Sequence, residues 1–187
     1  MADNELGVFP RAQKGAVTPG EVRPTVRALL ERLDPTPAVV VDRVGDVLAH
    51  TRGYARLAGP LGLLEGRPPN LSRYVFTDKR ARRAFPEWGR LADHRAKDLR
   101  AAVALGDPRA VALAEELSSN AGVGFSGRYQ AWPAMPARTG VERWAHPEAG
   151  ELLLAYESLD LADGDERRLI VYLPADDATS AALDRLT

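Results

Sequence analysis

The order of strand-like and helix-like segments constrains the fold of this chain more than any single motif does. Two strand-like segments come first, at 37–42 and 46–50, and the first holds three consecutive valines, which favour strands. A helical middle follows, and strand-like segments return at 138–146, 150–161 and 167–173. Because strands and helices do not alternate, a parallel doubly wound sheet is disfavoured. The order predicts an α+β fold, a five-stranded antiparallel sheet with helices inserted between strands 2 and 3.

Start and stop signals divide the helical parts of the chain. Apolar residues at helical spacing predict a helix over 23–33, ended by Asp34-Pro35. Further helices are predicted from a cap at Thr51, a cap at Asp78, Pro86 in a first turn, the pair Asp107-Pro108, and a closing segment at 179–186.

The longest of these helices has one polar residue on an otherwise apolar face. That face is formed by Trp88, Leu91, Ala92, Arg95, Leu99, Ala102 and Val103. Arg95 is the exception, and it is therefore the arginine whose position most needs an explanation.

Composition excludes several classes of function. The 187 residues suit one domain, and a net charge of −1 gives no field that would attract nucleic acid or an acidic membrane. The sequence has no cysteine and only three histidines, so we expect no cofactor and no metal site. No apolar run is long enough for a membrane span and no signal peptide is evident, so we expect a cytoplasmic protein without a membrane partner.

Aromatic residues are the first candidates for a binding site. They could wall an apolar cavity for an acyl chain or a ring, or they could simply fill the core. The candidates are Phe76, Phe85, Trp88, Phe125, Tyr129 and Trp132.

Three arginines, Arg73, Arg82 and Arg95, are candidates for holding an anionic head group, because a guanidinium grips a carboxylate at two points. The alternative is surface pairing with Asp78, Glu87 or Asp98. The basic residues between 73 and 100 alternate with acidic ones, which favours a solvated helix face over a nucleic-acid surface.

His146, followed by Pro147, could contact a ligand, act as a general base or make hydrogen bonds at the end of a hairpin. The sequence carries none of the common hydrolase, phosphate-loop or zinc-protease motifs, so we predict no enzyme. The rival hypothesis is a small enzyme that uses His146 with Asp42 or Glu151.

Several motifs, in this order, resemble the ligand-binding domain of MmyB-like transcription regulators, which follows a Xre-type helix-turn-helix. The resemblance covers about 23–187 and is carried by Asn70, Arg73, Phe76, Thr77-Asp78, Arg80-Ala81-Arg82, Phe85-Pro86, Trp88, Leu99-Arg100, Asp107-Pro108, Glu116-Leu117-Ser118, Phe125, His146-Pro147, Gly150-Glu151-Leu152, Tyr156-Glu157, Leu159 and Val171-Tyr172. It implies a PAS-like fold and a pocket for a fatty acid or another apolar or amphipathic small molecule. The candidate ligand contacts are Arg73, Phe76, Phe85, Trp88, Arg95, Tyr129, Trp132 and His146.

The first 22 residues resemble the leader that precedes the helix-turn-helix in these regulators. After Val22 the sequence passes directly to the expected linker helix, so we predict a loosely ordered leader remnant at 1–22, a PAS-like ligand-binding domain at 23–187 and no direct DNA binding. The predicted function is a small-molecule sensing domain of a transcriptional regulator, and a homodimer is expected. The alternative is a ligand-free dimerisation or interaction module.

Overall fold

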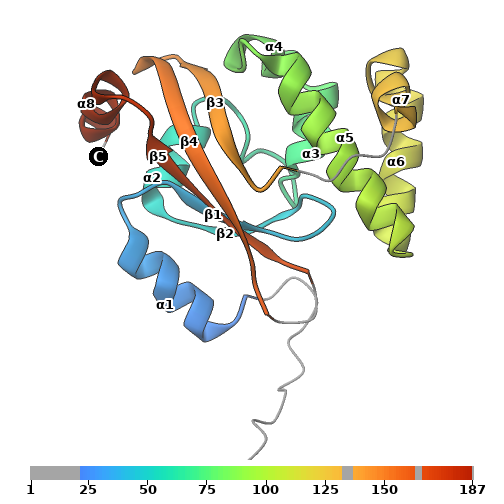
Figure 1. Ribbon diagram of the computed structural model, residues 1–187, viewed down its shortest axis with the longest axis horizontal. Helices are drawn as coiled ribbons and strands as arrows, with labels where there is room; N and C mark the ends of the chain where they lie inside the picture. Colours follow the sequence, from blue (N-terminus) through green and yellow to red (C-terminus); the bar gives the residue numbers. More distant parts are fainter. Residues whose placement is uncertain (1–21, 132–136, 163–165, 187) are drawn as a thin grey trace, which may run out of the picture.

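A computed structural model describes residues 22–131, 137–162 and 166–186, and it contains one antiparallel sheet of five strands. The predicted leader lies outside the described residues except for Val22, and Trp132 lies outside them as well. The spatial order of the strands is β2-β1-β5-β4-β3 (Figure 1). Their bounds are β1 Ala38–Val41, β2 Val47–His50, β3 Thr139–His146, β4 Gly150–Asp160 and β5 Arg168–Pro174.

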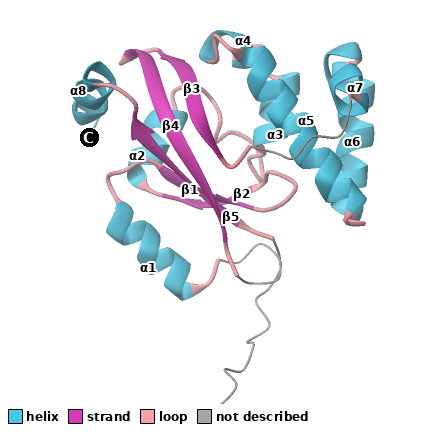
Figure 2. Cartoon of the chain, in the orientation of Figure 1, coloured by secondary structure: helices cyan, strands magenta, loops and turns pink. Residues whose placement is uncertain are grey.

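Helices occupy the insertion between β2 and β3, as predicted, so the α+β fold is confirmed (Figure 2). The inserted helices are α2 Arg52–Ala58, α3 Leu71–Thr77, α4 Ala81–Ala84, α5 Trp88–Ala104, α6 Pro108–Ala121 and α7 Val123–Gln130. Helices α1 Pro24–Leu33 and α8 Asp177–Leu186 lie at the two ends of the described chain. Helices α3, α5, α6 and α7 pack together at one side of the sheet (Figure 1).

The sheet has an inner face, which packs on the inserted helices, and an outer face, on which α1 lies. Side chains alternate along a strand, so Val39 and Val41 of β1 join the main core while Val40 faces Val26 and Leu30 of α1. The predicted two-sided apolar character of β4 follows the same rule. Its inward residues Leu152, Leu154 and Tyr156 are buried, and the alternate ones are half-buried.

The turn between β1 and β2 is fixed by a buried carboxylate. Asp42 Oδ1 accepts hydrogen bonds from the backbone N–H groups of Val44 and Asp46, and Gly45 between them has a φ of 92°, which favours glycine. Arg109 at the start of α6 then pairs with Asp42 and Asp46. The sheet is thereby tied to the helices that cover it.

Several predicted helix starts are confirmed, and others differ. The side chains of Thr51 and Asp107 accept backbone bonds at the starts of α2 and α6, as predicted. Asp78 accepts a 2.8 Å bond from the N–H of Arg80, but α4 begins three residues after it, at Ala81.

Pro86 was predicted in the first turn of a helix, but α5 begins at Trp88 after the N-cap residue Glu87, so Pro86 precedes the helix. Helix α3, which Asn70 caps, was not predicted. Helix α7 was missed because glycines at 124 and 127 lower its helix propensity.

Candidate ligand-binding site

An open groove runs between α5 and the edge strand β3, and it is called the outer groove below. It has a volume of about 300 Å³. One wall is a face of α5 with its preceding loop, and the other is a continuous run of β3, residues 139–143, with Tyr156 of β4 behind it. Alternate residues of a strand point to opposite faces. Five consecutive lining residues therefore mean that the groove runs along the edge of the sheet.

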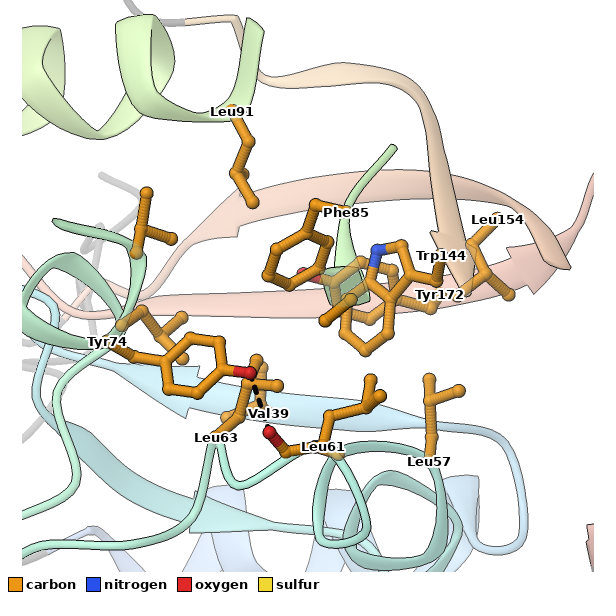
Figure 3. Packing of buried hydrophobic residues seen from close by; sticks show 14 of the residues in the cluster. Val39, Leu57, Leu61, Leu63, Tyr74, Phe85, Leu91, Trp144, Leu154 and Tyr172 are labelled. Carbon is orange, nitrogen blue, oxygen red and sulfur yellow. Dashed lines mark hydrogen bonds between the residues drawn. The ribbon is translucent and has the colours of Figure 1, made fainter. Parts of the chain in front are cut away.

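A second, much smaller hollow, the inner cavity, lies deeper between α5 and the sheet. Its volume is about 10 Å³, roughly the space for one water molecule. Its lining is mostly aromatic and aliphatic, with two ionisable exceptions, Arg95 and Glu142. The apolar lining consists of Tyr54, Leu63, Leu71, Val75, Phe85, Leu91, Trp144 and Tyr172. In Figure 3 Phe85, Trp144 and Tyr172 lie close together, and Leu91 points toward them from α5.

Arg95 is buried beside this cavity without a close ion pair. Only 6% of the residue is exposed, and its Nε has no hydrogen-bond partner in the described part of the chain. Its Nη1 lies 3.7 Å from Asp98 Oδ2, and the other oxygen of Asp98 accepts a 2.9 Å bond from Arg168 Nη1. A buried charge is costly unless it is paired and hydrogen-bonded, so the Arg95 side chain retains unused capacity to bind an anion.

Tyr54 adds a second unsatisfied group to the inner cavity. The residue is fully buried, and among the described residues its hydroxyl has no hydrogen-bond partner. Burial raises the pKa of Tyr54 far above its ordinary value, with Arg95 acting in the opposite direction. The hydroxyl therefore stays protonated and is free to donate a hydrogen bond.

Glu142 faces Arg95 from the strand side. Its Oε2 accepts a 2.9 Å bond from Trp144 Nε1. Burial raises the pKa of Glu142, although the nearby Arg95 and the Trp144 hydrogen bond both act to lower it. The hydrogen bond that the structure gives the Glu142 carboxylate therefore goes to Trp144 rather than to Arg95.

His94 and Asp98 complete the polar cluster. His94 Nε2 lies 3.7 Å from Asp98 Oδ2, and neither atom has a hydrogen-bond partner within the described ranges. Burial, and then the charge of Arg95, lower the pKa of His94 to about 4, so the imidazole is neutral at pH 7. Arg168 lowers the pKa of Asp98 against the effect of its burial, and Asp98 stays ionised.

The structure brings two of the predicted ligand contacts, Phe85 and Arg95, to these hollows. Arg73 is engaged elsewhere, since it makes two hydrogen bonds, of 2.7 and 2.9 Å, to Glu116 of α6. This partner differs from the three acidic residues that the sequence suggested.

Three predicted aromatic contacts pack among the helices. Phe76 meets Trp88 and Phe125 edge to face, and Tyr129 stacks on Phe125. The Trp88 Nε1–H donates to the carbonyl of Val75. The guanidinium of Arg82, the third predicted head-group arginine, lies over the Trp88 ring at 3.7 Å from its centroid.

His146 ends β3 in the hairpin, where its Nδ1 accepts 3.1 Å bonds from the N–H groups of Glu148 and Ala149. The rival enzyme required His146 to pair with Asp42 or Glu151. These carboxylates pair instead with Arg109 and Arg143. His146 also lines an open hollow of about 540 Å³ at the hairpin end, with Pro60, Arg83 and Pro147 among its neighbours.

Sequence reasoning missed Tyr54, Glu142 and Leu91 as site residues. A signal for Glu142 was present, because it shares the inward positions of β3 with Trp144 and His146, where an acidic residue is unexpected. Tyr54 gave no such signal, since a tyrosine at a buried helix position is common.

Metal binding and membrane crossing find no support in the part of the chain that the structure describes. It contains no group of three or more acidic, histidine or cysteine side chains placed to hold a metal ion. None of its described helices combines the length and the apolar character that a membrane crossing requires.

Comparison with known proteins identifies a family for this chain. No curated protein matches the chain. The family model for the MmyB-like transcription regulator ligand binding domain matches residues 22–186, which is nearly the whole sequence. The chain therefore belongs to the MmyB-like transcription regulator ligand-binding domain family.

Proposed function

We propose that the site between α5 and β3 binds an apolar or amphipathic small molecule, fatty-acid-like in build, and that the chain is a sensing domain. One observation carries the proposal. The buried guanidinium of Arg95 has an unpaired Nε beside an aromatic-lined cavity, while the carboxylate 3.7 Å away is already bonded to Arg168. Ligand sites typically combine an apolar lining with a few convergent polar groups.

Native mass spectrometry of the protein, purified without detergent, tests this proposal. The expected result is a bound small molecule that organic solvent extracts. Bare chain alone, together with no thermal stabilisation by decanoate or decanol, would contradict it.

The family suggests what ligand binding would do, since its domains are the ligand-binding parts of transcription regulators. The bound ligand would then control the regulator. Coupling between the bound ligand and helix α1 would run through Asp98, which joins Arg95 of the site to Arg168 of β5. Strand β5 pairs with β1, and the apolar face of α1 packs on both strands. In a relative with a Xre-type DNA-binding domain before α1, a coupling of about 1–3 kcal/mol through this route would suffice. We place such a regulator in the cytoplasm.

A homodimer is the second part of the proposal. Val141, Leu159 and Leu173 lie on the outer face of the sheet and are 48%, 51% and 47% exposed, and Val141 also lines the outer groove. Large apolar side chains gathered on one face favour an interface. Light scattering at high concentration tests this, and a strictly monomeric protein would contradict it.

We also propose that this chain does not bind DNA directly. Several of its basic residues pair with acidic partners, as in Arg73–Glu116, Arg80–Glu65 and Arg128–Asp93. A gel shift should show no salt-resistant complex, and tight, salt-resistant binding would refute this.

The alternative, a ligand-free dimerisation module, has one observation in its favour, the small volume of the inner cavity. It predicts a dimer without any extractable molecule, so the mass spectrometry experiment separates the two hypotheses. The enzyme hypothesis loses support because the bonds of His146 Nδ1 go to the backbone.

A further inference from the structure

The outer groove and the inner cavity are separated by shared side chains. Phe85, Leu91 and Glu142 line both hollows, and these three residues are called the partition below. In Figure 3 Leu91 hangs from α5 toward the core, and the ring of Phe85 faces Trp144. The ring centroids of Phe85 and Trp144 are 5.1 Å apart in an edge-to-face arrangement. These three shared residues therefore divide the two spaces.

The two hollows differ in chemistry. The inner cavity contains the buried side chains with unsatisfied donors, Arg95 Nε and the Tyr54 hydroxyl. Several charged residues of the outer groove are already paired, as Arg90 is with Glu87 and Arg143 with Glu151. The strongest unmet demand for an anionic group therefore lies at the deep end, behind the partition.

We infer that the outer groove and the inner cavity are the two ends of one site that takes a singly charged amphiphile head first. Its carboxylate accepts hydrogen bonds from Arg95 and Tyr54, and its alkyl chain runs back past Phe85 and Leu91 into the outer groove. This inference rests on the proposed function, and it adds the charge of the ligand, its direction and its route of entry.

The charges around the inner cavity favour a single negative charge. Arg95 and Arg168 are both cationic, and Asp98 is bonded to Arg168. The remaining carboxylate, Glu142, is bonded to Trp144 Nε1 and is raised in pKa by burial. Neither carboxylate is hydrogen-bonded to Arg95, so its single guanidinium is the group that one ligand carboxylate can bind.

The opposite orientation gives the unsatisfied donors of Arg95 and Tyr54 no acceptor. With the alkyl chain inside, the Arg95 guanidinium would lie against hydrocarbon, and its Nε would lose access to any acceptor. The head group would then lie near Arg90 and Lys97 of the outer groove, where solvent screens the charges. In that orientation the affinity should also fall sharply as the alkyl chain of the ligand lengthens, because the chain would end inside the closed core.

The partition must move for the ligand to enter, because about 10 Å³ does not hold a carboxylate. Phe85 lies outside the regular helices, as the residue that ends α4, and Leu91 lies in the first turn of α5. Side-chain rotation at these two positions would join the hollows without changing the sheet.

The first test compares the affinities of decanoate and decanol by calorimetry. The wild type should prefer decanoate, and Arg95→Gln should weaken decanoate by at least about tenfold while changing decanol little. Tyr54→Phe removes only the hydroxyl and should weaken decanoate in the same direction. The control is Arg73→Gln, which lies outside both hollows and should bind decanoate as the wild type does. The double variant Arg90→Gln with Lys97→Gln tests the opposite orientation and should weaken decanoate much less than Arg95→Gln does.

The second test concerns the partition and measures association rates by stopped flow. Leu91→Ala should speed the association of decanoate. Leu113→Ala, in a different apolar cluster on α6, is the control for general loosening and should not speed it.

Several outcomes overturn the inference while leaving the proposed function intact. One is that decanoate binds, but its affinity depends on Arg90 and Lys97 rather than on Arg95 and Tyr54. A sharp loss of affinity from octanoate to decanoate to dodecanoate is another, and an unchanged association rate in Leu91→Ala is a third. If the wild type binds neither decanoate nor decanol, the proposed function and the inference both fail.

Discussion

Arg95 Nη1 and Asp98 Oδ2 lie 3.7 Å apart, whereas Asp98 Oδ1 is hydrogen-bonded to Arg168 Nη1 at 2.9 Å. All three residues are buried. One carboxylate therefore serves two buried guanidinium groups unequally, with Arg168 well paired and Arg95 poorly paired. Removing Arg168 should therefore cost more stability than removing Arg95.

Arg95→Met should change the free energy of unfolding of the ligand-free protein by only about 1 kcal/mol, because the cost of burying this charge and its loose 3.7 Å contact with Asp98 largely offset each other. Arg168→Met should lower it by about 3 kcal/mol, because it leaves the Asp98 carboxylate without its close partner. Urea denaturation measures both changes. Equal destabilisation by the two variants would show that Arg95 is not the poorly paired cation.

Acidification should destabilise the protein through His94. Its pKa is about 4 in the folded protein against 6.5 for an unperturbed histidine, because burial and then Arg95 disfavour the charged ring. As the pH falls below 6.5 the unfolded chain gains this proton first, so stability falls between pH 6.5 and about 4. The loss is at most about 3 kcal/mol.

Urea titrations at pH 7.5, 6 and 5 measure this effect. His94→Gln should flatten the dependence on pH over that range, while His50→Gln, at an exposed position, should leave it unchanged. Parallel curves for His94→Gln and the wild type would contradict this role of His94.

His146→Ala should lower the free energy of unfolding by about 1–2 kcal/mol, because two hairpin N–H groups lose their acceptor. Decanoate affinity should not change. Glu148→Ala, which keeps the same backbone donors, is the matched control and should have little effect on stability. A loss of affinity in His146→Ala with unchanged stability would instead restore His146 as a ligand contact.

Arg73 and Glu116 should show a modest coupling in a double-mutant cycle, about 0.5–1 kcal/mol, because the pair is two-pronged but about 40% exposed. Arg73→Ala should leave decanoate affinity intact. If it weakens decanoate as much as Arg95→Gln does, the head group lies near α3 and the assignment to Arg95 is wrong.

The fold was largely predictable because its signals are local and periodic. The alternation in β4, the caps at Thr51 and Asp107, and the apolar face of α5 all follow from neighbouring residues. The same periodicity identified Arg95 as an exception on its helix face, and the structure places it beside the inner cavity.

The rest of the candidate site depends on contacts between distant segments. Tyr54, Arg95 and Glu142 come from α2, α5 and β3, and no spacing in the sequence relates them. Arg73 finds its partner at position 116 rather than among nearby acidic residues, because α3 packs against α6. Such pairings are set by packing, so the sequence could predict the residue types but not their partners.

A crystal structure with ω-bromodecanoate tests the central claim most directly, because the bromine marks the tail by anomalous scattering and the carboxylate marks the head. We predict the carboxylate within hydrogen-bond distance of Arg95 Nε and the bromine in the outer groove between α5 and β3. A bromine buried beside Tyr54, or no bound ligand between α5 and the sheet, would contradict the claim.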